Sequence, residues 1–420
     1  MKPSLMPVKA NERELFLDVI RGVAILGIFI ANITSLSWYS ENRKVTGPLL
    51  LPEWDHTIRY LQYVFIEGKF YSVFSVLFGW GIALQIKRAT YTGIDPMPIV
   101  RRRLVFMLLF GAFHILIWPG DIVFLYALVG FILLMLLKFS NKALLVTACA
   151  LILSPILLYW AKMNWPVLNY PSEMLFATGI KVDNAIHGYK TDEAYMEMMK
   201  NGNWMDQLKS NISGFFFRFS KLFFKSRVPK VLGLFLIGFV IGRSDFYKNL
   251  QQHKRLIYWV IGLGFLVGLP ANYYMAFYMS NHAGDYLQLK TNGLYQTIWY
   301  ALGVVPLALS YIGLLMLWYQ NLLFRKKMAV FAPVGKMAFT NYILQSLVGN
   351  FIFLGAGLGY KGTVGPVYLT LFAVAIFLVQ IVLSTVWLKH FNYGPIEWLW
   401  RSATYKKWWP FKKSGIINVG

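Results

Sequence analysis

The stretch LDVIRGVAILGIFIANITSLSW, residues 17–38, decides the class of the fold. It is an apolar run as long as the roughly 20 residues that an α-helix needs to cross a bilayer. Further runs of this kind recur along the chain, so the sequence predicts an all-α, polytopic transmembrane bundle of about ten spans. The predicted spans are 17–38, 61–86, 103–118, 122–137, 143–161, 228–242, 256–278, 294–319, 337–354 and 367–388.

The composition excludes an ordinary soluble enzyme. Of the 420 residues, 57% are hydrophobic and only 14% are charged, whereas a soluble domain has about 25% charged residues. The net charge is +23, but the basic residues form short clusters between apolar runs, which does not indicate nucleic-acid binding. The single cysteine, Cys149, excludes an internal disulfide framework and a cysteine-based zinc site.

The distribution of basic residues predicts the orientation in the membrane. If the N-terminus is cytoplasmic, the Lys and Arg residues of the short loops fall almost entirely on the cytoplasmic side, as the positive-inside rule requires. We therefore expect both termini to be cytoplasmic and the basic loops to contact anionic lipid headgroups. The first apolar run is long and carries Asp18 and Arg21, so we expect a retained helix rather than a signal peptide.

Three segments are expected along the chain. Residues 1–161 would form an N-terminal bundle of five spans that carries the candidate site. Residues 162–227 would form an extracytoplasmic cap, and its stretch GFFFRFSKLFFK, residues 214–225, is typical of an amphipathic helix in the membrane interface. Residues 228–420 would form a C-terminal bundle of five spans with a cytoplasmic tail.

Ionisable side chains within the first two predicted spans mark candidate functional positions, because such groups are costly inside a membrane. Arg21 and Asn32 are three helical turns apart on one face, and Asp18 lies beside Arg21. Glu67 and Lys69 flank a glycine in the second span. These residues also have a purely structural interpretation. Asp18 and Arg21 would form an ion pair at the membrane interface, and Asn32 would form an interhelical hydrogen bond. Glu67 and Lys69 would form a second ion pair.

The sharpest local feature is HILIWPGD, residues 114–121. Its Pro-Gly pair predicts a tight turn between antiparallel helices, with His114 inside the membrane and Asp121 at the start of the next helix. A histidine can act as a base or an acid near neutral pH, and an adjacent carboxylate would orient it. The alternatives are that Asp121 only caps the helix and that a neutral His114 bonds a carbonyl group.

Polar residues also recur in the predicted span 337–354, where Asn341 and Gln345 are spaced i,i+4. They are candidates either for substrate binding or for interhelical hydrogen bonds to Gln380 and Ser384 of the next span. No metal site is predicted, because the six histidines are scattered and none has the H-E-x-x-H spacing.

Five stretches together resemble the YeiB-like family of bacterial membrane proteins. These stretches are 17–27, 67–79, 114–126, 335–345 and 394–401. The family is similar at a distance to membrane acyltransferases, including heparan-glucosaminide N-acetyltransferase and the enzymes that O-acetylate surface polysaccharides. The resemblance implies a multi-pass protein of the bacterial cell membrane, transferring an acyl group from a coenzyme A thioester to an extracytoplasmic acceptor with an intramembrane histidine. Asn32 occupies the place of a functional asparagine in the glucosaminide enzyme, but no histidine follows it closely.

The first functional hypothesis is therefore an acyltransferase with no tightly bound cofactor and with acyl-CoA as co-substrate. His114 would be the base, Asp121 or Glu67 would orient it, and Asn32 would donate to the developing oxyanion. Arg21 and Lys69 would contact phosphates of the donor.

Two other classes remain open. A transporter or exporter of a small solute or lipid would use the same intramembrane charges as its pathway. A non-catalytic scaffold would leave the cost of those buried charges unexplained. The expected partners are membrane lipids and a small-molecule or glycan acceptor, and self-association is left open.

Overall fold

The computed structural model describes residues 15–39, 47–188, 192–244, 246 and 250–413, and in this part of the chain it is helical apart from two isolated β-bridges. Its first half contains α1 (Leu15–Leu36), α2 (Pro52–Phe65), α3 (Lys69–Tyr91), α4 (Met97–Ile117), α5 (Val123–Met135), α6 (Asn141–Asn164), η1 (Pro166–Asn169), α7 (Tyr170–His187) and α8 (Asp192–Asn201). Its second half contains α9 (Trp204–Phe224), α10 (Arg227–Arg243), α11 (Lys254–Leu263), η3 (Gly264–Gly268), α12 (Leu269–Asn281), α13 (Ala283–Leu287), α14 (Thr291–Gln320), α15 (Leu322–Met328), η4 (Ala329–Phe331), α16 (Ala332–Lys336), α17 (Ala338–Phe353), α18 (Pro366–His390) and α19 (Pro395–Tyr405).

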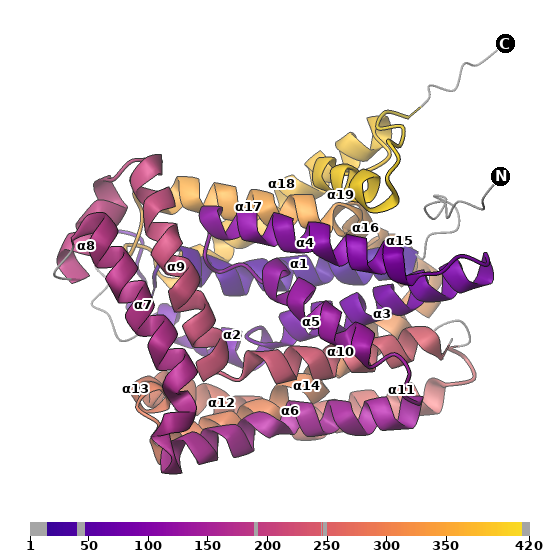
Figure 1. Ribbon diagram of the computed structural model, residues 1–420, viewed down its shortest axis with the longest axis horizontal. Coiled ribbons are helices and arrows are strands. Elements are labelled where there is room, and N and C mark those ends of the chain that lie inside the picture. The colour runs from indigo at the N-terminus through magenta and orange to yellow at the C-terminus, as the bar shows by residue number, and fades with distance from the viewer. Residues whose placement is uncertain (1–14, 40–46, 189–191, 245, 247–249, 414–420) are drawn as a thin grey trace.

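The long helices lie side by side along the longest axis of the molecule (Figure 1). At one end, helices α7 and α9 lie across the bundle, and we call this the cap end. At the opposite end α1 begins and α19 lies against the bundle. We call this the basic end, because the junction between α3 and α4 there carries Arg88 and the run 101–103.

Six stretches of the described chain are long and apolar enough to cross a membrane, which makes this a membrane protein of transmembrane helices. They are Leu15–Ser37, Pro52–Tyr91, Asn141–Asn164, Lys254–Asn281, Thr291–Gln320 and Pro366–His390. The other four predicted spans fall on α4, α5, α10 and α17, which are shorter or begin with basic residues. The count of about ten spans therefore stays a prediction. The second predicted span, 61–86, is not one continuous helix, since α2 ends at Phe65 and α3 begins at Lys69.

Helix α1 lies inside the bundle, whereas other apolar helices lie at its periphery. In α1, 67% of the most apolar window is buried, compared with 28% in α6 and in α18. One hydrophobic cluster combines α1 with α3, α4, α5, α10, α17 and α18, so helices from both halves of the chain share a core. Of the polar residues of α1, Asp18 is buried, whereas Arg21 and Asn32 are half-buried.

Glycine permits the closest helix crossings. A Cβ atom on Gly79 of α3 would lie 2.0 Å from the carbonyl oxygen of Phe235 on α10. A Cβ atom on Gly238 of α10 would lie 1.9 Å from the carbonyl oxygen of Val76 on α3. These distances require glycine at both positions, as in the small-residue interfaces of membrane helices.

The crossing of α3 and α10 supplies a stability prediction. Gly238→Ala should destabilise the fold by about 1–3 kcal/mol, because the added methyl group overpacks the interface. The control is Gly262→Ala, whose Cβ would have no atom within 4 Å. Since alanine favours a helix over glycine by about 1 kcal/mol, the control should be neutral or stabilising. Thermal unfolding of the two purified variants tests this, and an equal loss in both would contradict the packing argument.

Candidate functional site

His114 and Asp121 form a fully buried pair. His114 lies in the last turn of α4, Asp121 precedes α5, and the turn between the helices brings the side chains together. The His114 Nδ1 atom lies 2.8 Å from Asp121 Oδ1, and neither side chain is exposed. The tight turn and the proximity of the two residues follow the expectation from the sequence.

The environment of Asp121 defines the direction of the hydrogen bond. Asp121 Oδ2 accepts a hydrogen bond of 2.7 Å from the backbone N–H of Phe124, so the carboxylate also caps the start of α5. An ionised Asp121 carboxylate only accepts hydrogen bonds, so a neutral His114 beside it carries its proton on Nδ1. The Nε2 atom then carries a lone pair, and it has no hydrogen-bond partner among the described residues. This is the arrangement that a general base needs.

Residues distant in sequence hold this pair in place. Arg218 of α9 donates from Nε and Nη2 to the carbonyl oxygen of Asp121, at 3.2 and 2.9 Å. Burial lowers the pKa of Arg218 to about 10, which leaves the guanidinium charged near neutral pH. Asn211 and Asn350 donate to the carbonyl oxygen of Ile117 at the end of α4. Sequence reasoning missed all three, because their partners are set only by the tertiary fold.

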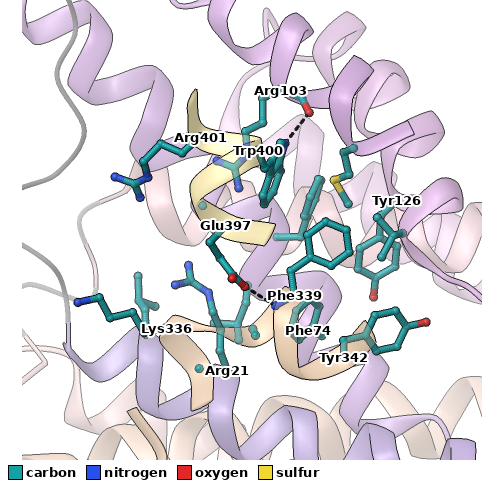
Figure 2. Close-up of a pocket in the computed structure, with 18 of the residues that line it drawn as sticks. Arg21, Phe74, Arg103, Tyr126, Lys336, Phe339, Tyr342, Glu397, Trp400 and Arg401 are labelled. Atoms are coloured by element: carbon teal, nitrogen blue, oxygen red, sulfur yellow. Dashed lines mark hydrogen bonds between the residues drawn. The ribbon is translucent and has the colours of Figure 1, made fainter. Parts of the chain in front are cut away.

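A cavity of about 500 Å³ extends between α1, α3, α4, α5, α17 and α19 (Figure 2). Its walls are mostly apolar and aromatic, and they include Ile28, Phe74, Phe78 and Met107. Its volume lies in the range of about 300–1,000 Å³ that is typical of small-molecule sites. The cavity therefore has room for part of an extended ligand.

Basic side chains line one side of the cavity, and tyrosine side chains line the opposite side. Figure 2 shows Arg21, Lys336 and Arg401 on the side away from Tyr126 and Tyr342. The lining contains five cationic residues against one carboxylate, that of Glu397. The cationic residues are Arg21, Arg88, Arg103, Lys336 and Arg401.

We call the part of the cavity lined by these five cations the basic mouth. Neighbouring side chains hold its residues in position. Arg103 Nη1 donates to Gln85 Oε1 at 2.8 Å, and its guanidinium lies 4.8 Å from the ring centroid of Trp400. Trp400 Nε1 in turn donates to the Arg103 carbonyl oxygen at 3.1 Å. Arg21 pairs with Asp18 at 2.8 Å. Helix α19 thus completes the mouth against α1 and α4.

Glu397 of α19 fixes the beginning of α17. One carboxylate oxygen accepts from the N–H groups of Phe339 and Thr340, at 2.7 and 3.0 Å, and the other accepts from the Thr340 hydroxyl at 2.5 Å. Burial raises the pKa of Glu397, while these hydrogen bonds act in the opposite direction. The carboxylate therefore serves as an N-terminal cap supplied by another helix.

Two residues connect the pair to the cavity. Tyr342 lines the cavity, and its ring centroid lies 5.0 Å from that of His114. Ile122, which follows Asp121 directly, also lines it. His114 and Asp121 therefore lie directly behind the tyrosine side of the wall, opposite the basic mouth.

The other predicted site residues have different locations. Arg21 lines the cavity at the basic mouth, where the sequence hypothesis expected a contact with phosphates. Asn32 is half-buried and does not line the cavity. The Lys69 ammonium donates to the carbonyl oxygens of Tyr63 and Glu67, at 2.6 and 3.0 Å, and Lys69 does not line the cavity, so its role in binding stays a prediction. Its charge satisfies backbone groups at the break between α2 and α3. Glu67 lies at the same break, whereas the partner of His114 is Asp121.

Asn341 and Gln345 form hydrogen bonds between helices, and their role in substrate binding stays a prediction. Asn341 Nδ2 donates to Ser384 Oγ at 3.0 Å, and Gln345 Nε2 donates to Gln380 Oε1 at 2.9 Å. Gln380 Nε2 donates to the Asn341 carbonyl oxygen at 3.0 Å. These are the interhelical hydrogen bonds between α17 and α18 that the i,i+4 spacing offered as an alternative to substrate binding.

Comparison with known proteins places this arrangement in a family. The chain is 32% identical to the uncharacterized protein YxaH of Bacillus subtilis, over 98% of each chain. The chain belongs to the YeiB-like family. Protein YeiB of Escherichia coli, also uncharacterized, is 26% identical over 94% of this chain and 97% of its own. An uncharacterized 39.9 kDa protein from the amylase 3′ region of Bacillus acidopullulyticus is 28% identical over 96% and 97%.

Residues 241–407 match the family model described as a protein of unknown function, DUF418. This region contains α17 and α19, which form part of the cavity wall and its mouth. No solved structure matches the chain. Across the described residues, no group of three or more His, Cys, Asp or Glu side chains is placed to hold a metal ion.

The cap on α17 can be tested by substitution. Glu397→Ala should cost about 0.5–2 kcal/mol of stability, the usual loss when an N-terminal cap is removed. Glu53→Ala, in an exposed position of α2, is the matched control and should be close to neutral. Thermal unfolding of both variants measures the difference, and a stable Glu397→Ala protein would show that the cap does not hold α17.

Proposed function

We propose that this protein is a membrane acyltransferase that moves an acyl group from a coenzyme A thioester to a hydroxyl or amine acceptor. The observation that supports this most directly is the buried pair of His114 and Asp121 behind a cavity with a basic mouth. A phosphate-bearing donor with a long, thin acyl arm matches such a cavity in both charge and shape.

The donor would enter at the basic end. Its phosphates would contact cationic residues of the mouth, among them Arg21, Arg103 and Arg401. Its pantetheine arm and acyl group would extend between Phe74, Phe78 and the other apolar residues of the wall. The thioester would then lie near Tyr342, next to His114.

The transfer step uses His114 as a proton carrier. His114 Nε2 takes the proton of the acceptor hydroxyl or amine while the acceptor atom bonds to the thioester carbonyl carbon. The carbon–sulfur bond then breaks, and the leaving thiolate takes the proton from Nε2. Asp121 holds the Nδ1 proton and stabilises the imidazolium that forms between these steps. The Tyr342 hydroxyl would donate to the developing oxyanion, in the role that Asn32 was expected to have.

The orientation follows from the same proposal. The basic end would face the bacterial cytoplasm, where acyl-CoA is made, so both termini would be cytoplasmic. The cap end would face outward, and the acceptor would be an extracytoplasmic or lipid-linked small molecule or glycan. The protein would need no tightly bound cofactor, since acyl-CoA acts as a co-substrate.

Donor binding is the first test. Coenzyme A titrated into the purified protein in nanodiscs should bind, and Arg401→Gln should weaken binding about tenfold, since each lost charge-assisted contact is worth about one such factor. Lys326→Gln, an exposed cation on α15 outside the cavity, should bind as the wild type does. Isothermal titration calorimetry gives both values, and absent binding to the wild type would favour a transporter.

Chemistry is the second test. Thiol release from acetyl-CoA should fall at least about 100-fold in His114→Ala, the typical contribution of a general base. Asp121→Asn should also lower the rate, because the amide no longer favours the same tautomer. Unfolding temperatures control for damage to the turn, and His114→Gln provides a second variant of similar size. Undiminished thiol release in folded histidine variants would contradict the mechanism.

A further inference from the structure

A second group of cations lies in α9 and at the start of α10, and it includes Arg218, which donates to the carbonyl oxygen of Asp121. We call it the cap-end cation cluster, and it consists of Arg218, Lys225, Arg227 and Lys230. None of these residues lines the basic-mouthed cavity. Arg218 holds the carbonyl group of Asp121, but the catalytic step uses none of the four cations, so the purpose of the cluster is unexplained.

Tyrosines of α3 and α14 organise the centre of the cluster. The Arg227 guanidinium lies 4.3 Å from the ring centroid of Tyr71, and its Nη1 donates to Tyr300 Oη at 3.4 Å. Tyr300 Oη donates to Tyr71 Oη at 3.0 Å, and the Lys230 ammonium lies 4.4 Å from the Tyr300 ring centroid. Aromatic faces thus hold both cations in fixed positions without neutralising them.

The charge of the cluster is not balanced by the carboxylates that interact with it. The positive charges of Arg227, Lys225 and Lys162 all act on Lys230. Glu67 is the carboxylate that interacts with Arg227 and Lys225. Gathered cations with too few carboxylates repel one another, and burial strengthens that repulsion. An anion is the natural partner for such an arrangement.

The exposure of the cations increases from Lys230 to Lys225, so an anion could reach them from the surface of the protein. Lys230 is only 7% exposed, Arg227 is half-buried, and Lys225 is exposed. Helix α10 begins at Arg227, so its first N–H groups add a positive dipole end to the same place. A ligand could therefore meet Lys225 first and approach Arg227 and Lys230 behind it.

We propose that the cap-end cation cluster binds a phosphate group, with Arg227 and Lys230 as its main contacts. If the acyltransferase function is correct, this phosphate belongs to the acceptor. Arg218 connects the two sites, because it interacts electrostatically with Arg227 and donates to Asp121. Donor phosphates would then bind at the basic mouth and the acceptor phosphate at this separate cluster, none of whose residues lines the cavity.

The test uses the full-length protein and two phosphate sources. In the first arm, inorganic phosphate is titrated into the protein in phosphatidylcholine nanodiscs. In the second arm, native mass spectrometry counts phosphatidylglycerol molecules retained by detergent-solubilised protein. The double variant Arg227→Gln/Lys230→Gln is compared with Lys326→Gln/Lys327→Gln, which removes two exposed cations of α15. Arg227→Lys, which keeps the charge, controls for damage to the fold.

Saturable binding in either arm, weakened about tenfold or more in the Arg227/Lys230 double variant, is the expected result. Binding of inorganic phosphate would indicate a soluble phosphorylated ligand, and retention of phosphatidylglycerol alone would indicate a lipid headgroup. Saturable binding in neither arm would overturn the proposal, as would an equal loss in the α15 double variant.

Coenzyme A binding, measured in the same proteins, separates this inference from the acyltransferase proposal. The Arg227/Lys230 variant should bind coenzyme A like the wild type. If the wild type binds phosphate at the cluster but not coenzyme A, the phosphate site stands and the acyltransferase proposal fails.

Discussion

The hydrogen bond between His114 and Asp121 is the interaction on which this account depends. Both side chains are fully buried, so each needs the other to satisfy its polar atoms. Asp121 also caps α5, and its carbonyl group is held by Arg218. A residue with this many roles cannot be replaced by an apolar side chain without disturbing the turn, the histidine and the contact with α9 together.

The packing of the bundle explains how a polar site exists inside a membrane protein. Close crossings at Gly79 and Gly238 hold α3 tightly against α10. On the other side, a Cβ on Gly335 of α16 would lie 1.7 Å from the Asp18 carbonyl oxygen, so α16 presses against α1. With α1 inside the bundle, Arg21 of this helix lines the cavity between these layers.

Much of the fold could be predicted from the sequence, because apolar length and loop charge act locally. The turn at 118–121 and the contact of His114 with Asp121 were also predictable, since both depend on a few adjacent residues. The roles of Arg218, Glu397 and Tyr342 were not, because each contacts a partner far away along the chain. A contact between residues so far apart leaves no pattern in the nearby sequence that could predict it.

Three predicted binding residues use their polar groups within the fold. Lys69 was expected to contact the donor's phosphates, and carbonyl groups exposed by the break between α2 and α3 bind its ammonium. The side-chain amides of Asn341 and Gln345 are likewise used to join α17 to α18. Inside a membrane protein, polar groups form hydrogen bonds with one another, and only the groups that remain can bind ligands.

The central claim is that one continuous path connects the basic mouth to His114. A cryo-electron microscopy structure with a non-hydrolysable thioether analogue of acetyl-CoA tests it most directly. We expect density for the analogue with its phosphates beside Arg21 and Arg401 and its sulfur end against Tyr342, within reach of His114 Nε2. Well-resolved side chains with the cavity empty at saturating analogue, or with the analogue bound elsewhere, would contradict it.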